Sequence, residues 1–160
     1  MNAVDVIVED EAWGAIESKT RLVEQAIAAA AAEISDALPG VIAVLLTEDA
    51  AMADLNTRFR QQPGPINVLS FPASEHTANH LGDMALASGI VIAEARERSL
   101  HLADHLRHLI VHGFLHLQGY DHLDDDEALV MESIERRALA RLGVADPYRD
   151  TIGGGTQADE

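Results

Sequence analysis

One stretch of the sequence, HGFLHLQGYDH from His112 to His122, constrains the fold of this chain more than any other. It continues a run of histidines that recur every three or four residues: His101, His105, His108, His112 and His116. At about 100° per residue, this spacing places all five imidazoles in one narrow stripe of a helix. We therefore predict a helix from Leu102 to about Leu117 with a histidine face.

The way this helix ends separates three histidines from the rest. His112 and His116 are one helical turn apart, so both can bind one metal ion. Gly119 can adopt the positive φ that ends a helix and turns the chain back, which brings His122 to the same point. Three neutral imidazoles and a water form an open tetrahedral zinc site. The alternative is a histidine-rich polar face without a metal. His108 and His112 show that the spacing alone is not decisive, because they are also four residues apart but no exit turn follows them to bring a third ligand.

The same spacing occurs in the zinc proteases called metzincins, whose signature is HExxHxxGxxH. Gly113 stands where those proteases carry the glutamate that takes a proton from the zinc-bound water. Cleavage of a peptide bond depends strongly on such a base, whereas RNA supplies its own 2′-OH as a nucleophile. The pattern therefore favours a phosphodiester or another activated substrate over an amide.

Composition narrows the chemistry further. No cysteine is present, which excludes disulfides, thiolate zinc sites and a cysteine nucleophile. The formal net charge of −16 argues against broad electrostatic binding to nucleic acid but is compatible with a local basic groove. No segment approaches the ~18 apolar residues of a membrane span, and the first residues lack a signal-peptide pattern. We expect a cytoplasmic protein that does not associate with membranes.

The remaining pattern predicts one α+β domain over residues 1–150 and a disordered tail over residues 151–160. Strands are expected at 4–8, 41–46, 66–71 and 81–87. Helices are expected at 18–38, 47–59, 90–99, 102–117 and 124–142. The order of the strands in the sheet cannot be read from one sequence.

Two of these helices have predicted details that a structure can test. Thr47 is expected to cap the second helix, and Asp124 with Glu127 forms a capping box for the last one. The inward face of the second helix is expected to consist of Met52, Leu55 and Phe59.

At these residues the sequence resembles the YbeY family of bacterial endoribonucleases and ribosomal RNA maturation factors. HGFLHLQGYDH is similar to the family signature, and three upstream segments match in the same order: LNTRFR at 55–60, INVLSFP at 66–72 and LGDMAL at 81–86. LARLGVADPY at 139–148 is similar to the family's C-terminus, so the resemblance covers roughly residues 40–148. One departure is Ile66, where the family usually has threonine.

The resemblance implies a zincin-like fold with a mixed sheet of about four strands and about five helices. It implies one zinc ion held by His112, His116 and His122, and a functional arginine at Arg60 that holds a phosphate. The implied activity is single-strand-specific cleavage of rRNA, including late maturation of the 16S rRNA 3′ end, and ribosome quality control. The implied partners are single-stranded RNA, the small ribosomal subunit and its assembly factors, and not DNA.

An acidic chain with an RNA substrate predicts a local arrangement of charge. We expect Arg58, Arg60 and Arg107 to border the metal cleft, with residues 124–127 and the last helix elsewhere. Asp83 is expected either to accept a hydrogen bond from a ligand histidine or to be an edge residue. Two other functions stay open: a ribosome-assembly factor with a structural metal site, motivated by the net charge of −16, and a metallopeptidase, which rests on the metzincin spacing alone.

Overall fold

The centre of the molecule is a mixed sheet of four strands. The computed structural model describes residues 2–61, 64–73 and 79–148, and the strand order is β1-β2-β4-β3. β1 (Val4–Val8), β2 (Val41–Thr47) and β4 (His80–Ala87) run parallel, and β3 (Val68–Pro72) is antiparallel to β4 at one edge. The expected mixed sheet is confirmed, whereas the predicted tail over 151–160 lies outside the described residues.

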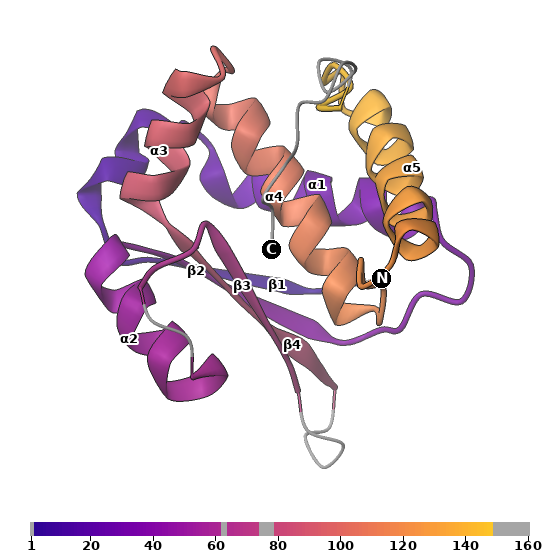
Figure 1. The fold of residues 1–160 in the computed structure, drawn as a ribbon, viewed down its shortest axis with the longest axis horizontal. Coiled ribbons are helices and arrows are strands. Elements are labelled where there is room, and N and C mark those ends of the chain that lie inside the picture. Colours follow the sequence, from indigo (N-terminus) through magenta and orange to yellow (C-terminus); the bar gives the residue numbers. More distant parts are fainter. Residues whose placement is uncertain (1, 62–63, 74–78, 149–160) are drawn as a thin grey trace.

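Helices cover both faces of this sheet, but unequally (Figure 1). Within the described residues there are five α-helices and a short 3-10 helix at Glu11–Ala15: α1 (Lys19–Ala32), α2 (Asp49–Arg60), α3 (Ser88–Glu97), α4 (Leu102–Leu117) and α5 (Asp125–Arg141). The α1, α4 and α5 helices lie on one face, and α2 alone lies on the other. The expected α+β class with five helices is confirmed. No helix among the described residues is long and apolar enough to cross a membrane.

The alternation of side chains along the strands builds two hydrophobic clusters, one on each face. Leu46 and Met84 belong to the larger cluster with α1, α4 and α5, whereas Ala85 belongs to the smaller one with Met52 of α2. The α3 helix meets α2 at its first turn, where the Ile90 N–H donates a hydrogen bond of 3.2 Å to Asp49, whereas the last turn of α2 is poorly covered. The expectation that Phe59 faces inward is therefore wrong, since its exposed fraction is 59%.

The start of α2 also differs from the expectation. Thr47 does not cap the helix; it is the last residue of β2, and its hydroxyl donates a hydrogen bond to Glu9. The cap is Glu48, whose carboxylate accepts hydrogen bonds from the backbone N–H groups of Ala50 and Ala51 at 2.6 and 3.1 Å. The longer side chain reaches two of the donors that a helix start leaves without partners.

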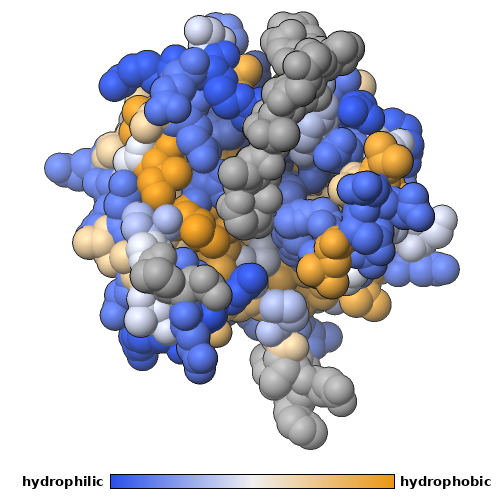
Figure 2. Space-filling view, in the orientation of Figure 1, coloured by the Kyte–Doolittle hydropathy of each residue, from blue (hydrophilic) through white to orange (hydrophobic). Residues whose placement is uncertain are grey.

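The other helix limits agree better with the sequence pattern. The α4 bounds are those expected, and the Asp124 side chain accepts a hydrogen bond from the Glu127 N–H at 2.8 Å, as the capping box predicts. The α1 helix is shorter than predicted, because it ends at Ala32 and Asp36 takes a left-handed conformation with φ of 56°. Most of the outer face in Figure 2 is hydrophilic, and hydrophobic side chains reach it in a few patches, one of them between α2 and α3.

Candidate metal centre

The helix that carries the histidines packs closely on the sheet at Gly113. A Cβ atom at this position would lie 2.5 Å from the Met84 sulfur and 3.1 Å from the Ser70 hydroxyl oxygen. The same hydroxyl donates a hydrogen bond of 3.1 Å to the Gly113 carbonyl. A side chain at Gly113 would therefore point into the contact between α4 and the β3–β4 pair. At the position where a metzincin carries its glutamate, any side chain here would have to displace the Met84 side chain, so Gly113 has a packing cause as well as a chemical consequence.

Three histidines meet at the C-terminal end of α4. His112, His116 and His122 each offer a ring nitrogen, and these atoms all lie within 4.8 Å of one another. The Nε2 atoms of His112 and His116 are 3.1 Å apart, and the buried Nε2 of His122 has no hydrogen-bond partner within the described part of the chain. A buried polar atom without a partner is costly, and a cation shared by the three nitrogens removes that cost. The donor set fits a zinc ion, which accepts imidazole nitrogen in tetrahedral sites.

The turn after α4 brings His122 back as the sequence predicts. Gly119 has φ of +97°, and the Tyr120 N–H donates a hydrogen bond of 3.0 Å to the Leu115 carbonyl. The Tyr120 carbonyl in turn accepts a hydrogen bond of 3.0 Å from Nδ1 of His116. With its Nδ1 protonated, His116 presents Nε2 as the atom that can bind a metal. One turn therefore sets both the position of His122 and the tautomer of His116.

The environment of His116 also keeps its ring neutral. Burial, followed by the neighbouring imidazoles of His112 and His122, lowers the pKa of His116 to about 4. A histidine must be unprotonated at the binding nitrogen to hold a metal. The site is consequently ready for a cation at neutral pH.

A buried glutamate from the last helix fixes the ring of His112. Glu135 of α5 is fully buried, and its Oε2 accepts a hydrogen bond of 2.7 Å from Nδ1 of His112. Its Oε1 accepts one of 2.9 Å from Nε2 of His108 and another from the Tyr148 hydroxyl. Burial raises the pKa of the Glu135 carboxyl, but the hydrogen bonds from His108 and His112 outweigh it and hold that pKa well below its ordinary value. The expectation that the last helix lies away from the metal centre is wrong.

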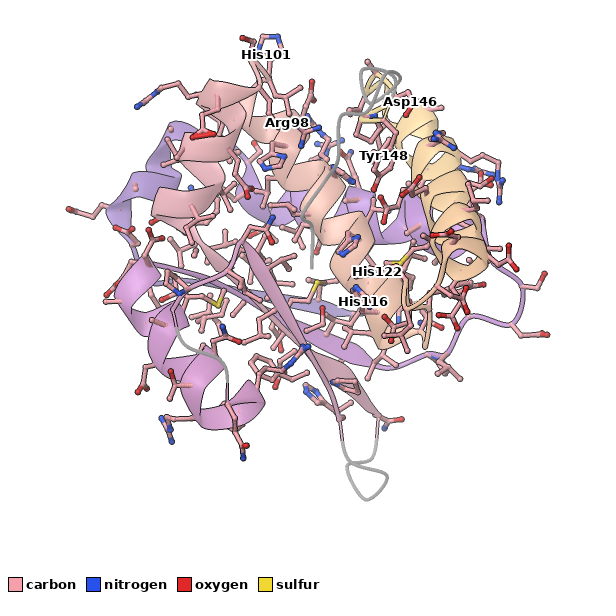
Figure 3. All side chains as sticks on the ribbon, in the orientation of Figure 1. Arg98, His101, His116, His122, Asp146 and Tyr148 are labelled. Atoms are coloured by element: carbon pink, nitrogen blue, oxygen red, sulfur yellow. The ribbon has the colours of Figure 1, made fainter. Side chains whose placement is uncertain are left out.

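Tyr148 is held at this carboxylate by its own surroundings. The Asp146 carboxylate accepts hydrogen bonds from the Tyr148 N–H at 2.8 Å and from the Arg136 side chain at 3.2 Å. The Arg136 guanidinium also lies over the Tyr148 ring, 5.3 Å from its centre. In Figure 3, His116 and His122 lie together at the end of α4, and Tyr148 lies between α4 and α5.

The two histidines nearer the start of the stripe are hydrogen-bonded core residues. Nε2 of His105 lies 2.8 Å from the Glu94 carboxylate, which also accepts hydrogen bonds of 3.2 and 3.3 Å from the Asn67 side chain. His108 contacts Glu135 as described above, and both rings are buried. The alternative of a histidine face without metal ligands therefore applies to this end of α4. Here Asn67 of the INVLSFP segment ties the edge strand to α3 and α4.

The arginines expected at the metal cleft have other surroundings. Arg58 pairs with Asp54 at 3.3 Å, and Arg107 pairs with Asp104 at 2.7 Å. Arg60 is the last residue of α2 and lines a cavity of about 720 Å³ with residues of the sheet. Arg58 and Arg107 are therefore paired with carboxylates, and Arg60 faces this cavity.

Asp83 is likewise not a partner of a ligand histidine. Its carboxylate pairs with Nε2 of His80 at 2.8 Å, near the start of β4, and its side chain is half-exposed. The role of an edge residue is not observed either, because β4 is an inner strand and Asp83 lies between Ala43 of β2 and Phe71 of β3.

Comparison with known proteins now decides the family. The model of the family described as Endoribonuclease YbeY matches residues 7–143. This chain belongs to the YbeY family. A protein of Maricaulis maris named Endoribonuclease YbeY is 66% identical over 148 residues, which cover 92% of each chain. A protein of Azorhizobium caulinodans with the same name is 44% identical, covering 91% of this chain and 95% of its own length. The enzyme class is therefore that of a hydrolytic nuclease.

A solved structure has a similar fold. The solution structure of TM1509 from Thermotoga maritima is similar to this chain with a TM-score of 0.56 and 25% sequence identity, covering 94% of this chain and 98% of that one. The zincin-like YbeY architecture expected from the sequence therefore fits the observed fold.

Sequence reasoning missed Glu135 and Tyr148. A signal for Glu135 was present, because it lies four residues after Met131 and next to Ile134 on the face of the last helix that the apolar pattern turns inward. A carboxylate on an inward face requires a partner, and the unassigned His108 was available. Nothing comparable marks Tyr148, which belongs to no helix or strand.

Proposed function

We propose that this protein is a zinc-dependent endoribonuclease that cleaves single-stranded RNA during rRNA processing, including late maturation of the 16S rRNA 3′ end, and in ribosome quality control. The observation that carries the proposal is the group of three ring nitrogens within 4.8 Å in a member of the YbeY family. Zinc is the preferred ion because the donors are three imidazoles without carboxylate or thiolate.

The residues of the site divide the work between holding and orienting. His112, His116 and His122 hold the ion, while Glu135 and the Tyr120 carbonyl fix the rings of His112 and His116 through their Nδ1 atoms. Zinc bound there supplies a Lewis acid that polarises a phosphoryl oxygen and lowers the pKa of a water. Since Gly113 provides no base, the site suits a substrate with an internal nucleophile, as RNA has.

Arg60 is proposed to bind a phosphate of the same substrate. A guanidinium binds phosphate oxygens through two parallel hydrogen bonds and stabilises negative charge. No carboxylate within the described residues pairs with Arg60, in contrast to Arg58 and Arg107. This leaves its charge available in a chain whose net charge is −16.

The acidic surface also bears on the partners. A chain with a net charge of −16 gains little from long-range attraction to RNA. We infer that the small ribosomal subunit and its assembly factors bring the enzyme to its rRNA site in the cytoplasm. DNA, which has no 2′-OH, is not a substrate.

The decisive experiment compares zinc content and RNA cleavage in matched variants. Wild-type protein is expected to carry about one zinc per chain and to cut a single-stranded RNA, whereas His116→Ala loses both. His101→Ala is the control, because His101 is exposed at the start of the same stripe and makes no side-chain cap contact. Cleavage by His116→Ala protein in the presence of a chelator would refute the proposal.

The net charge favours one second candidate, a ribosome-assembly factor in which the metal is structural. Its test uses the same His116→Ala variant in cells that lack the wild-type protein. Normal rRNA ends in those cells, with the variant folded and present at normal abundance, would favour this candidate over the nuclease. No observation favours a peptidase, because Gly113 supplies no base and a side chain at that position would meet the Met84 sulfur.

A further inference from the structure

A cavity lies on the face of the sheet that α2 covers, opposite the face that carries α4 and the three histidines. It is the cavity of about 720 Å³ in which Arg60 lies, a volume within the range of small-molecule binding sites. Its walls come from α2 and from β2, β3 and β4, and they are mainly apolar. Leu45, Leu55 and Ala85 form part of its floor. We call this feature the α2 cavity.

Two phenylalanines give the α2 cavity an aromatic wall. Phe59 and Phe71 lie with ring centres 5.4 Å apart at an interplanar angle of 72°. Phe59 is 59% exposed, although it is one of three phenylalanines in a chain with few aromatic residues. An exposed ring at the rim of an apolar cavity is a surface on which a flat ligand can stack.

Two arginines lie at the rim of the α2 cavity, and Arg60 is the one of them without a carboxylate partner among the described residues. Arg60 lines the α2 cavity directly, and the Arg58 guanidinium lies 5.6 Å from the centre of the Phe59 ring. The carboxylate in the lining, Asp83, is already paired with His80 at 2.8 Å. An aromatic surface beside an arginine suits a nucleotide, whose base stacks and whose phosphate carries the negative charge.

The edge strand β3 separates this cavity from the metal centre. Ser70 of β3 lines the α2 cavity, and its hydroxyl donates to the carbonyl of Gly113, the residue after His112. Because β3 is the last strand of the sheet, none of the described strands lies beyond it. Packed layers in proteins are about 10 Å apart, so a few nucleotides of extended RNA span the distance around this edge.

We propose that the α2 cavity binds one unpaired base of the RNA substrate, stacked on Phe59, with Arg60 on the phosphate of that nucleotide. The RNA then passes the free edge of β3 and places a neighbouring phosphodiester at the metal centre. This assignment rests on the proposed RNA substrate. It gives Arg60 a binding role at some distance from the zinc ion.

The test measures binding of a 2′-O-methyl RNA, which lacks the free 2′-OH and is not cut, to zinc-loaded protein. Phe59→Ala is expected to weaken binding by about 5- to 150-fold, the range for loss of one base–aromatic stack, with unchanged zinc content. Leu129→Ala is the matched control, because Leu129 is a hydrophobic residue of α5 with a similar exposed fraction of 61%. Equal binding by the two variants overturns the proposal while leaving the nuclease activity standing.

An oligonucleotide with single abasic positions identifies what Phe59 contacts. One abasic position is expected to weaken binding to the wild type but not to Phe59→Ala, since the same stack cannot be lost twice. For Arg60→Ala, the slope of log affinity against log salt is expected to fall by about 0.7, the value for one single-strand phosphate contact. If no abasic position is coupled to Phe59, or if Phe59→Ala instead dissociates a dimer or releases a protein partner, the base-binding assignment is wrong.

Discussion

The two ends of the α4 histidine stripe use the same residue at the same spacing for different purposes. Near its start, His105 and His108 are buried against the carboxylates of Glu94 and Glu135. At its end, the rings of His112 and His116 face each other with Nε2 atoms 3.1 Å apart. The helix is regular throughout, so the difference comes from what lies opposite each ring. A histidine whose Nε2 faces a carboxylate becomes a hydrogen-bonded core residue, and one whose Nε2 faces another imidazole becomes a candidate ligand.

Glu135 prevents the two ends from being independent. One carboxylate oxygen accepts from His108 and the other from His112. A buried carboxylate that fixes the ring of a metal-binding histidine commonly has a large effect on affinity. The stripe is therefore one connected network with a binding end and a supporting end.

The largest expected effect is a difference in zinc binding between variants at the two ends of the stripe. His122→Ala is expected to abolish zinc binding and RNA cleavage, because the remaining two imidazoles leave the tetrahedral site incomplete. His105→Ala is expected to keep about one zinc per chain but to lower the free energy of unfolding by about 1–3 kcal/mol, since it removes one of the two side chains that hydrogen-bond the partly buried Glu94 carboxylate. Metal analysis and urea unfolding of both variants measure the contrast. If His105→Ala also loses zinc without unfolding, the two ends do not differ in purpose.

Glu135→Gln is expected to weaken zinc binding by about 10- to 100-fold, the usual cost of losing the residue that orients a ligand. The amide keeps the shape of the side chain but cannot accept through both atoms. Competition with a chromophoric chelator measures the affinity. Glu132→Gln on the same helix is the control, because the Glu132 carboxylate pairs with Arg136 at 3.9 Å. An unchanged affinity in a folded Glu135→Gln protein would show that Glu135 serves the supporting end alone.

In the metal-free protein, a falling pH is expected to lower the free energy of unfolding first through His116, at the binding end, and only then through Glu135. The pKa of His116 falls from 6.5 to about 4 on folding, so between these values the unfolded chain takes up a proton that the folded one does not. The free energy of unfolding therefore decreases as the pH falls from about 6.5 towards 4. The pKa of Glu135 is also lowered on folding, so its contribution is present above its ordinary value of 4.5 and is lost below it. Urea unfolding across this range should show the first decline in wild type and a smaller one in His116→Ala; identical curves would contradict it.

The smallest effect is expected for a variant of Tyr148, the residue that supports Glu135 from beyond the last helix. Tyr148→Phe removes the hydroxyl that donates to Glu135 and is expected to lower the free energy of unfolding by about 1 kcal/mol. His108 and His112 still donate to the carboxylate, so zinc affinity should fall by less than in Glu135→Gln. Thermal unfolding with and without zinc measures both quantities. A loss of zinc affinity equal to that of Glu135→Gln would mean that the hydroxyl, and not the histidine contacts, positions this carboxylate.

Local patterns in the sequence predicted the grouping of the three histidines better than they predicted its surroundings. The histidine spacing and Gly119 are features of one helix and its exit turn, and both were found as expected. The contacts of Glu135 with His112 and of Tyr148 with His108 join residues 23 and 40 positions apart. Such contacts depend on how α5 packs against α4, and an apolar pattern states that a face is buried without stating what covers it.

The position of Arg60 shows the same limit for the sheet. LNTRFR and INVLSFP are close in the sequence, but β3 is antiparallel at the edge and separates α2 from α4. Strand order was not readable from the sequence, so the side of the sheet that Arg60 occupies was not readable either. The prediction that Phe59 faces inward failed for a related reason, since periodicity cannot reveal how well other elements cover the last turn of α2.

The contact of Tyr148 with Glu135 also sets an order of events while the chain is being made. Synthesis proceeds from the N-terminus, so α4 and its histidines emerge before α5, and Tyr148 is added after every other residue of the network. An unfinished chain can form the histidine helix, but its buried carboxylate still lacks one of its three hydrogen-bond donors. The support of the histidine group is therefore completed only once Tyr148 has been added, and a premature stop before Tyr148 yields a chain with the three histidines and without the full support.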